Sequence, residues 1–357
     1  MNKPFSDKLR AVEPYTPGEQ SKNNDIIKLN ANENPYPPSP KVIEAIKGFE
    51  AEKLCLYPSS SAYALTEALA QYHGLDVNQV FVGNGSDEVI ALSYLAFFNS
   101  DKPIFFPDIT YSFYPVWCRL FNVPYETKSV DKNFIINPKD YYSANGGVIL
   151  PNPNAPTGIS EGRGFIEDIL DHNRDVIVII DEAYVDFGGY SAIELINKYD
   201  NLIVVQTFSK SRSLAGMRIG AAFGSAELIS LLKAVKNCYN SYPIDSVAIA
   251  AGVASVEDDA YFKNTINKVI RTRERFSQEL KGLGFTVFPS HSNFVFASKP
   301  DVNAKSLFEA AKKENIYIRY FDLPRIDNFL RITIGTDEQM DIFLNFIKRY
   351  LSSLSGC

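Results

Sequence analysis

The sequence contains few of the residues that build metal sites and disulfides. Three of its 357 residues are histidine and four are cysteine: His73, His172, His291, Cys55, Cys118, Cys238 and Cys357. No two histidines lie close in sequence and no Cys-x-x-Cys pair is present, so the spacing of a zinc site is missing. We therefore expect no bound metal, and we expect the scattered cysteines to stay reduced, as in a cytoplasmic protein.

The sequence also lacks an excess of basic charge and long apolar runs. Its formal net charge is −6, which argues against nucleic acid as the main partner, because phosphate binding requires a basic face. No apolar run approaches the roughly 20 residues that a membrane helix needs. Residues 1–20 carry charges and prolines where a signal peptide has an apolar core. These features predict a cytoplasmic protein with neither a membrane nor a nucleic-acid partner.

What the sequence does contain is a series of short apolar runs that end in polar residues. Segments long enough for helices separate the runs VFVGNG (80–85), PIFFP (103–107), GVILPNP (147–153), VIVIIDEAY (176–184) and LIVVQTFSK (202–210). Continuous runs of Val and Ile are typical of strands buried on both faces, so we predict an α/β fold with a parallel sheet covered by helices. Ligands of such sheets bind beyond the carboxyl ends of the strands.

The texture of the chain suggests three parts. Residues 1–39 are rich in Pro, Asn and Glu and lack helical periodicity, so we expect an arm that lies on the rest of the molecule. Residues 40–245 contain the predicted sheet and form the large domain. Strands and amphipathic segments mix in residues 246–357, which predicts a smaller α+β domain.

Chemically active side chains gather where three of these strands end. NGSDE (84–88) joins a strand to a helix through small residues, so its free backbone N–H groups are suited to a phosphate. DEAY (181–184) contributes a carboxylate and a phenol, TFSK (207–210) adds two hydroxyls and a lysine, and Arg218 follows. This combination suits pyridoxal phosphate, whose aldehyde condenses with a lysine and whose ring nitrogen needs a carboxylate.

Each of these features also has a simpler interpretation. A cluster of Lys and Arg after a strand is usually a solvated loop, and Ser86 or Asp87 would serve equally well as a helix N-cap. Tyr57 and Tyr111, taken singly, would be ordinary half-buried aromatics, and Arg331 could form a surface ion pair. The functional interpretation therefore depends on the strand ends lying together.

Several segments resemble a known family. NPNAPTG, DEAY and TFSKSRSLAGMR, in this order, are similar to the fold type I aminotransferases, which use pyridoxal 5′-phosphate. LNANENPYPPSP, LYPSS, PDITYSFY and FLRITIGT narrow the resemblance to the histidinol-phosphate aminotransferases, and the similarity extends over essentially the whole chain. The resemblance implies a large domain with a mostly parallel central sheet, a smaller α+β domain, and a homodimer with shared active sites. It also implies that the N-terminal arm packs on the small domain and on the dimer partner.

The resemblance also implies roles for individual residues. Lys210 would form the Schiff base with the cofactor and move the substrate proton, Asp181 would pair with the ring nitrogen, and Tyr184 would hydrogen-bond the ring 3-oxygen. The remaining cofactor contacts would come from Gly85, Ser86, Asp87, Tyr111, Thr207, Ser209, Arg218 and, from the partner subunit, Tyr57. The substrate would contact Arg331, Arg319, Tyr15 and Asn32.

One position departs from the family pattern, and one basic residue has no implied role. The family commonly has Asn directly before Pro-Thr-Gly, touching the ring 3-oxygen, whereas this chain has Ala155. We expect Asn154, one position earlier, to take over that contact after a small shift of the turn. We expect Arg212 to be a solvated residue.

The implied activity is the exchange of an amino group between L-glutamate and imidazole acetol phosphate, which gives L-histidinol phosphate and 2-oxoglutarate in histidine biosynthesis. An aromatic amino-acid aminotransferase or a threonine-phosphate decarboxylase on the same scaffold is the main alternative. A binding protein without catalysis is disfavoured because a binder needs no activated lysine. A plain nucleotide-binding protein is disfavoured because no G-x-G-x-x-G opens the first strand–helix turn.

Overall fold

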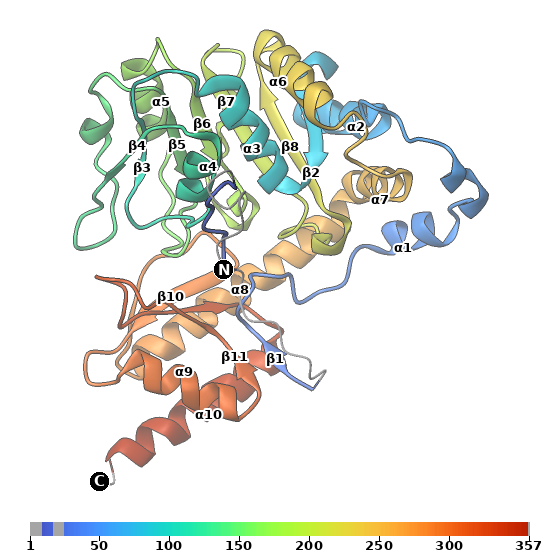
Figure 1. The fold of residues 1–357 in the computed structure, drawn as a ribbon. Helices are drawn as coiled ribbons and strands as arrows, with labels where there is room; N and C mark the ends of the chain where they lie inside the picture. The colour runs from blue at the N-terminus through green and yellow to red at the C-terminus, as the bar shows by residue number, and fades with distance from the viewer. Residues whose placement is uncertain (1–8, 17–24, 356–357) are drawn as a thin grey trace, which may run out of the picture.

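The computed structural model describes residues 9–16 and 25–355, so Cys357 lies outside the described residues. Its main element is a seven-stranded sheet in the upper part of the molecule as drawn in Figure 1. The strands follow one another across the sheet in the order β2 (Val80–Asn84), β8 (Ile219–Gly224), β7 (Leu202–Thr207), β6 (Val178–Asp181), β5 (Val148–Pro151), β3 (Ile104–Pro107) and β4 (Tyr125–Lys128). Six of the seven strands run in the same direction, and β8 runs opposite to them. The prediction of an α/β fold with a mostly parallel sheet is confirmed.

The central strands form because both of their faces are covered by apolar side chains. In β6, Val178, Ile179 and Ile180 are each fully buried, and burial of one such side chain contributes about 1.5–3 kcal/mol to folding. Val178 and Ile180 belong to one apolar core while Ile179 belongs to another, as the alternation of a strand requires. Successive strand residues therefore anchor helices on opposite faces of the sheet.

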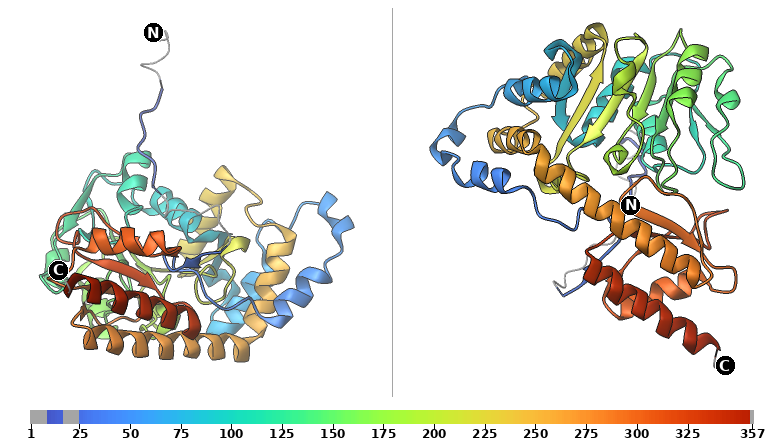
Figure 2. Two further views of the ribbon diagram at one scale, coloured as in Figure 1. Left: turned by 90° about the horizontal axis from the view of Figure 1, so that it is seen from below. Right: turned by 180° about the vertical axis from the view of Figure 1, so that it is seen from behind.

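Helices cover both faces of this sheet (Figures 1 and 2). One core lies under α3 (Gly85–Phe97), α4 (Tyr114–Phe121) and α6 (Ala226–Tyr239). The other lies under α1 (Pro40–Lys47), α2 (Tyr63–His73), α5 (Arg163–His172) and α7 (Ser246–Glu257). Short 3₁₀ helices at 51–55, 77–79, 138–141, 185–187, 192–195 and 215–217 connect the larger elements.

A second sheet lies below the first in Figure 1 and consists of four antiparallel strands. Their order is β12 (Arg319–Tyr320), β13 (Leu330–Thr333), β10 (Phe294–Ser298) and β9 (Thr286–Val287). It shares an apolar core with the long helix α8 (Asp259–Gly282) and with α9 (Ala304–Lys313) and α10 (Asp337–Ser355). Beside it, β1 (Ile27–Lys28) pairs in parallel with β11 (Ile316–Tyr317), which fastens the chain before α1 to this part of the molecule.

The predicted division after residue 245 stays a prediction. Two helices, α7 and α8, follow this position. Ala248 and Ala251 of α7 are buried in the core of the large sheet, whereas Val269 and Phe276 of α8 belong to the core of the small sheet. The passage from one core to the other therefore falls between these helices.

Over the described residues, none of the helices is long and apolar enough to cross a membrane. In the same residues no group of three or more His, Cys, Asp or Glu side chains is arranged to hold a metal ion. Cys55, Cys118 and Cys238 are free thiols.

Candidate active site

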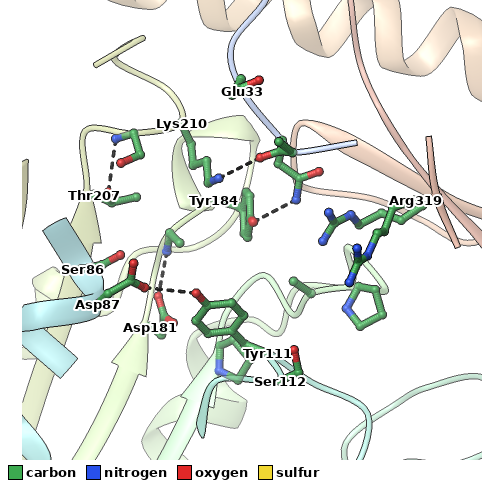
Figure 3. A pocket seen from close by; sticks show the side chains of 18 of the residues that line it. Glu33, Ser86, Asp87, Tyr111, Ser112, Asp181, Tyr184, Thr207, Lys210 and Arg319 are labelled. Atoms are coloured by element: carbon green, nitrogen blue, oxygen red, sulfur yellow. Dashed lines mark hydrogen bonds between the residues drawn. The ribbon is translucent and has the colours of Figure 1, made fainter. Parts of the chain in front are cut away.

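A cavity of about 280 Å³ opens at the carboxyl ends of the parallel strands, between the two sheets (Figure 3). Of the site residues that the sequence predicted, those that line it are Tyr15, Asn32, Ser86, Asp87, Tyr111, Asp181, Tyr184, Thr207, Ser209, Lys210, Arg218, Arg319 and Arg331. These residues come from segments far apart in the sequence: residues 9–16, the chain around residue 32, four parts of the chain between residues 85 and 218, and the small sheet. The volume of the cavity is near the lower end of the roughly 300–1,000 Å³ that is usual for small-molecule sites.

Asp181 ends β6 and is nearly completely buried at the floor of the cavity. Its Oδ2 accepts a hydrogen bond of 2.8 Å from the hydroxyl of Tyr114, and its Oδ1 accepts one of 3.2 Å from the backbone N–H of Ala183. Neither donor is a cation, so burial dominates and raises the pKa of Asp181 to about 6. A buried carboxylate in this state is suited to pair with a protonated nitrogen of a ligand.

Lys210 follows the end of β7 and extends toward the centre of the cavity (Figure 3). Its Nζ donates a hydrogen bond of 3.2 Å to the carbonyl oxygen of Ala31 and lies 5.8 Å from the ring centre of Tyr184. Among the described residues, one backbone carbonyl thus holds the amine on the cavity side, where a ligand aldehyde could replace that contact.

At another edge of the cavity, the start of α3 meets Arg218. Gly85 opens the helix with a φ of 77°, and a Cβ atom there would lie 2.5 Å from Nη2 of Arg218. A Cβ on Gly220 would lie 2.3 Å from the backbone of Gly85, so both glycines are needed for this close approach. Free N–H groups of a helix start and a guanidinium together form a cradle for an anion.

Two side chains hold Arg218 in this cradle. Its Nη1 donates a hydrogen bond of 3.2 Å to Oγ of Ser209, and its Nη2 lies 3.3 Å from Oδ2 of Asp87. The other oxygen of Asp87 accepts a hydrogen bond of 3.1 Å from the hydroxyl of Tyr111. The pair between Asp87 and Arg218 is well exposed and therefore weak, so an incoming phosphate can compete for the guanidinium.

Two arginines of the small sheet face the opposite side of the cavity. Arg319 on β12 and Arg331 on β13 are paired across the antiparallel ladder. Nη2 of Arg331 donates a hydrogen bond of 2.8 Å to the carbonyl oxygen of Asn30, while its buried Nε has no hydrogen-bond partner within the part of the chain that the structure describes. Burial lowers the pKa of Arg331. Arg331 is therefore no surface ion-pair residue, and the two neighbouring cations favour an anionic ligand.

Tyr15, in the described segment 9–16, lies near Arg319 and Arg331. Tyr15 stacks on Phe113 with ring centres 4.7 Å apart, and it lies close enough to Arg319 and Arg331 for both to lower the pKa of its phenol. Burial outweighs the two cations and raises the pKa of Tyr15 overall. Tyr15 thus closes the cavity on the side of the arginines.

Three predicted site residues do not line the cavity. Gly85 lies behind Arg218, as described above. Asn154 is buried in the turn after β5, where its Nδ2 donates to the carbonyl of Ile109 and its Oδ1 accepts from Thr110, so its amide is already engaged. Ala155, the departure from the family pattern, lines the cavity instead. Tyr57 is 83% exposed and stacks on Tyr242, with ring centres 4.7 Å apart.

The prediction that Arg212 is solvated is wrong. Its guanidinium lies 3.9 Å from the ring centre of Phe262 and donates a hydrogen bond of 2.8 Å to the carbonyl oxygen of Ser255. Burial lowers its pKa. The reason is that Ser255 of α7 and Phe262 of α8, more than 40 residues further along the chain, contact the loop after β7.

Tyr114 is the functional residue that the sequence reasoning missed. It is fully buried at the start of α4 and donates the strongest hydrogen bond to Asp181. Its ring packs edge-on against that of Tyr111 with ring centres 5.6 Å apart, and no local pattern of the sequence indicated its contact with Asp181.

Comparisons with known proteins point to one family. The model of the family "Aminotransferase class I and II" matches residues 24–347. The chain is 52% identical to histidinol-phosphate aminotransferase of Lactococcus lactis subsp. cremoris (strain MG1363), with 98% of each chain covered. It is 54% identical to that of Acinetobacter baumannii (strain SDF), with 94% of each chain covered.

Solved structures give the same picture. A putative histidinol-phosphate aminotransferase from Erwinia carotovora atroseptica superimposes with a TM-score of 0.85 at 25% identity, over 92% of this chain and 97% of the other. A histidinol-phosphate aminotransferase from Sinorhizobium meliloti, solved in complex with pyridoxal-5′-phosphate, has the same fold with a TM-score of 0.84 at 22% identity, over 92% and 91% of the two chains.

Proposed function

The chain belongs to the class I and II aminotransferases, and within them to the histidinol-phosphate aminotransferases, and we propose on this premise how its residues carry out the transamination. The reaction exchanges an amino group between L-histidinol phosphate and 2-oxoglutarate, and thus links imidazole acetol phosphate and L-glutamate in histidine biosynthesis. One observation carries the assignment of roles. Lys210, Asp181, Arg218 and Arg331 all line one cavity at the carboxyl ends of the strands.

We propose pyridoxal 5′-phosphate as the cofactor, because the donor set fits each part of that molecule. The cradle of Gly85 and Arg218 suits a phosphate, the buried carboxylate of Asp181 suits a ring nitrogen, and Lys210 suits an aldehyde. When bound, pyridoxal phosphate supplies a ring that withdraws electrons from the α-carbon of the substrate. Ser86, Asp87, Thr207 and Ser209 would complete the phosphate site, and Tyr111 would cover the ring.

The amine of Lys210 has two tasks in this proposal. It holds the cofactor in the resting enzyme, and after the substrate amine takes its place it moves a proton at the α-carbon of the substrate. The carbonyl oxygen of Ala31, which accepts from Nζ at 3.2 Å, holds the freed amine inside the cavity between these tasks. Lys210 therefore never has to leave the site.

Asp181 and Tyr184 set the charge of the site. Asp181 would supply a negative charge at the cavity floor to the ring nitrogen of the cofactor, and the hydroxyl of Tyr114 holds that carboxylate in place. Tyr184 presents its hydroxyl to the centre of the cavity and is proposed to donate to the ring 3-oxygen. Asn154, whose amide is engaged with Ile109 and Thr110, supports the turn rather than the ring.

The two arginines bind the anionic end of each substrate. The planar fork of a guanidinium fits a carboxylate and a phosphate about equally well, which a site with two alternating substrates requires. Arg331 is the main anchor, and Arg319 and Tyr15 assist it from the cavity wall. Because Tyr15 also covers the cavity, it helps to exclude water from the reacting atoms.

We further propose that two chains associate and share their active sites. The chain from α1 to α2 extends away from the large sheet in both views of Figure 2. This extension and the adjacent end of α6 expose large apolar side chains: Leu54, Leu56, Tyr57, Tyr63, Tyr239 and Tyr242. An exposed apolar surface of this kind is typical of a subunit interface. Tyr57 would reach the phosphate site of the second copy. The arm of residues 1–39, of which residues 1–8 and 17–24 lie outside the described residues, would pack on the small domain and the partner.

The substrate assignment is tested by comparing three reactions of one preparation. We expect turnover of histidinol phosphate with 2-oxoglutarate to exceed that of phenylalanine, and we expect no carbon dioxide from threonine phosphate. A higher kcat/KM for phenylalanine, or release of carbon dioxide, would assign the chain to one of the sister activities. We also propose that the enzyme acts in the cytoplasm.

A further inference from the structure

The segment Asn30–Asn32 passes between the two sheets and contacts both. Its three successive backbone carbonyls accept hydrogen bonds from Arg331, Lys210 and Asn293. These three bonds use backbone oxygens, so they hold the segment whatever side chain stands at position 32. The side chain of Asn32 is nevertheless almost completely buried and fully engaged, which suggests a task of its own.

The side chain of Asn32 links Thr333 to Tyr184. Oγ1 of Thr333 accepts a hydrogen bond of 3.0 Å from the backbone N–H of Asn32 and lies 2.9 Å from its Oδ1. Nδ2 of Asn32 donates a hydrogen bond of 2.9 Å to the hydroxyl oxygen of Tyr184. All of these atoms belong to residues far apart in sequence, at positions 32, 184 and 333.

The hydrogen bonds of Thr333 determine which way the side-chain amide of Asn32 is turned. Because Oγ1 of Thr333 already accepts a proton from the backbone, its own proton is free to go to Oδ1 of Asn32. An amide turned the other way would point two donors at Thr333 and leave the threonine proton without this acceptor. Oδ1 therefore faces Thr333, and Nδ2 faces Tyr184.

The direction of the amide fixes the hydroxyl of Tyr184. A phenol has one proton to give, and the position on the side of Asn32 is taken by the incoming N–H of the amide. The Tyr184 proton must then point away from Asn32, toward the open cavity. The ring itself cannot turn freely, since it packs edge-on against Phe294 with ring centres 5.1 Å apart.

We propose that Asn32 is a positioning residue which makes Tyr184 a hydrogen-bond donor toward the cofactor, rather than a residue that contacts the substrate. Asn32 also adopts a left-handed backbone with a φ of 54°, which Asn tolerates better than most residues. The inference rests on the proposed function, because it concerns the donor to the ring 3-oxygen. It adds that the donor depends on a chain that begins at Thr333.

A double-mutant cycle on cofactor binding tests this proposal. Asn32→Gly keeps the left-handed backbone and the bond from the backbone N–H to Thr333, but deletes the side-chain amide and with it the bonds to Tyr184 and from the Thr333 hydroxyl. We expect it to weaken equilibrium binding of pyridoxal phosphate to the apoprotein by about 2- to 12-fold, as for one neutral hydrogen bond. In the Tyr184→Phe background the same change should alter binding by less than about twofold. The visible absorbance of the loaded protein changes with pH, and the midpoint of this change should shift in Asn32→Gly relative to the unmodified protein. In the double variant the midpoint should equal that of Tyr184→Phe alone.

Asn293→Ala is the matched control, because Asn293 is equally buried and its amide donates to the same segment, at the carbonyl of Asn32. It should leave the absorbance midpoint unchanged. Asn32→Asp keeps the volume and the backbone preference, and replaces the glycine variant if that one does not fold. A carboxylate can only accept from Tyr184, so its effect should be the larger of the two.

An effect of Asn32→Gly that persists in the Tyr184→Phe background, or one that Asn293→Ala reproduces, would show that Asn32 only holds the backbone, and would overturn the proposal. If the unmodified apoprotein does not bind pyridoxal phosphate, the proposed function itself fails, which is a separate result.

Discussion

Asp181→Asn should make the apoprotein more stable at neutral and alkaline pH, because the carboxylate is buried and forms no ion pair with the described residues. Burial raises the pKa of Asp181 from 3.8 to about 6. One pKa unit corresponds to about 1.4 kcal/mol, so ionising this group in the folded protein costs about 3 kcal/mol. Since the folded pKa lies above the unfolded one, the stabilising contribution of Asp181 is complete below about pH 4 and is lost as the pH rises through 6.

Asparagine carries no charge and avoids this cost. Its amide can still accept from the N–H of Ala183 and donate to Tyr114, but the proton of Tyr114 then loses its acceptor, a loss of about 1 kcal/mol. We therefore expect Asp181→Asn to raise the free energy of unfolding by about 2 kcal/mol at pH 8. At pH 4 the advantage should vanish or reverse by about 1 kcal/mol.

Urea unfolding of both apoproteins at the two pH values, at equal protein concentration, measures this difference. Other groups titrate over the same range in both proteins, so the difference between the proteins isolates Asp181. The gain in stability should be accompanied by weaker binding of pyridoxal phosphate, because the protonated ring nitrogen of the cofactor would no longer meet the carboxylate of Asp181. An equal loss of stability at both pH values would refute the reasoning.

Two further variants address the arginine pair and the proposed dimer. Arg331→Lys replaces a planar fork with a point charge, so KM for both glutamate and histidinol phosphate should rise about tenfold or more in steady-state assays, and an effect on only one substrate would contradict the shared site. Tyr57→Ala should weaken binding of pyridoxal phosphate by about tenfold if the phenol makes one bond to the phosphate. The inactive Lys210→Ala chain and the Tyr57→Ala chain can be refolded together and assayed at a low concentration of pyridoxal phosphate. The mixture should be more active than either variant, because each hybrid dimer has one site with both residues intact. No gain in activity would show that Tyr57 serves its own chain.

The strand-end residues could be predicted from the sequence for a simple physical reason. Parallel strands share one carboxyl edge, so Asp181 and Thr207, which end neighbouring strands of the sheet, had to lie together with Lys210 just beyond. Asp181 and Glu182 are adjacent, and successive side chains of a strand point to opposite faces, so only one of the two carboxylates can face the cavity. The sequence does not say which one, because that depends on how the strand lies in the sheet. Glu182 points the other way, where Ser191 and Gln206 donate to it, and burial raises its pKa to about 8.

The contacts that support these residues could not be predicted. Tyr114 reaches Asp181 across 67 positions, and Thr333 reaches Asn32 across 301. Such contacts depend on how helices and the small sheet pack against the large sheet, and a local pattern carries no information about that packing. The burial of Arg212 was missed for the same reason, because the helices that cover it lie further along the chain.

The central claim is that Lys210 is the amine that holds the cofactor and then moves the proton at the α-carbon of the substrate, and one half-reaction tests it most directly. Protein loaded with pyridoxal phosphate and mixed with glutamate alone should release 2-oxoglutarate in a burst of about one equivalent per site, together with loss of the yellow absorbance. Lys210→Ala should give no burst although the protein is folded and binds the cofactor. A burst of the same size and rate from Lys210→Ala, or none from the unmodified protein, would contradict the account.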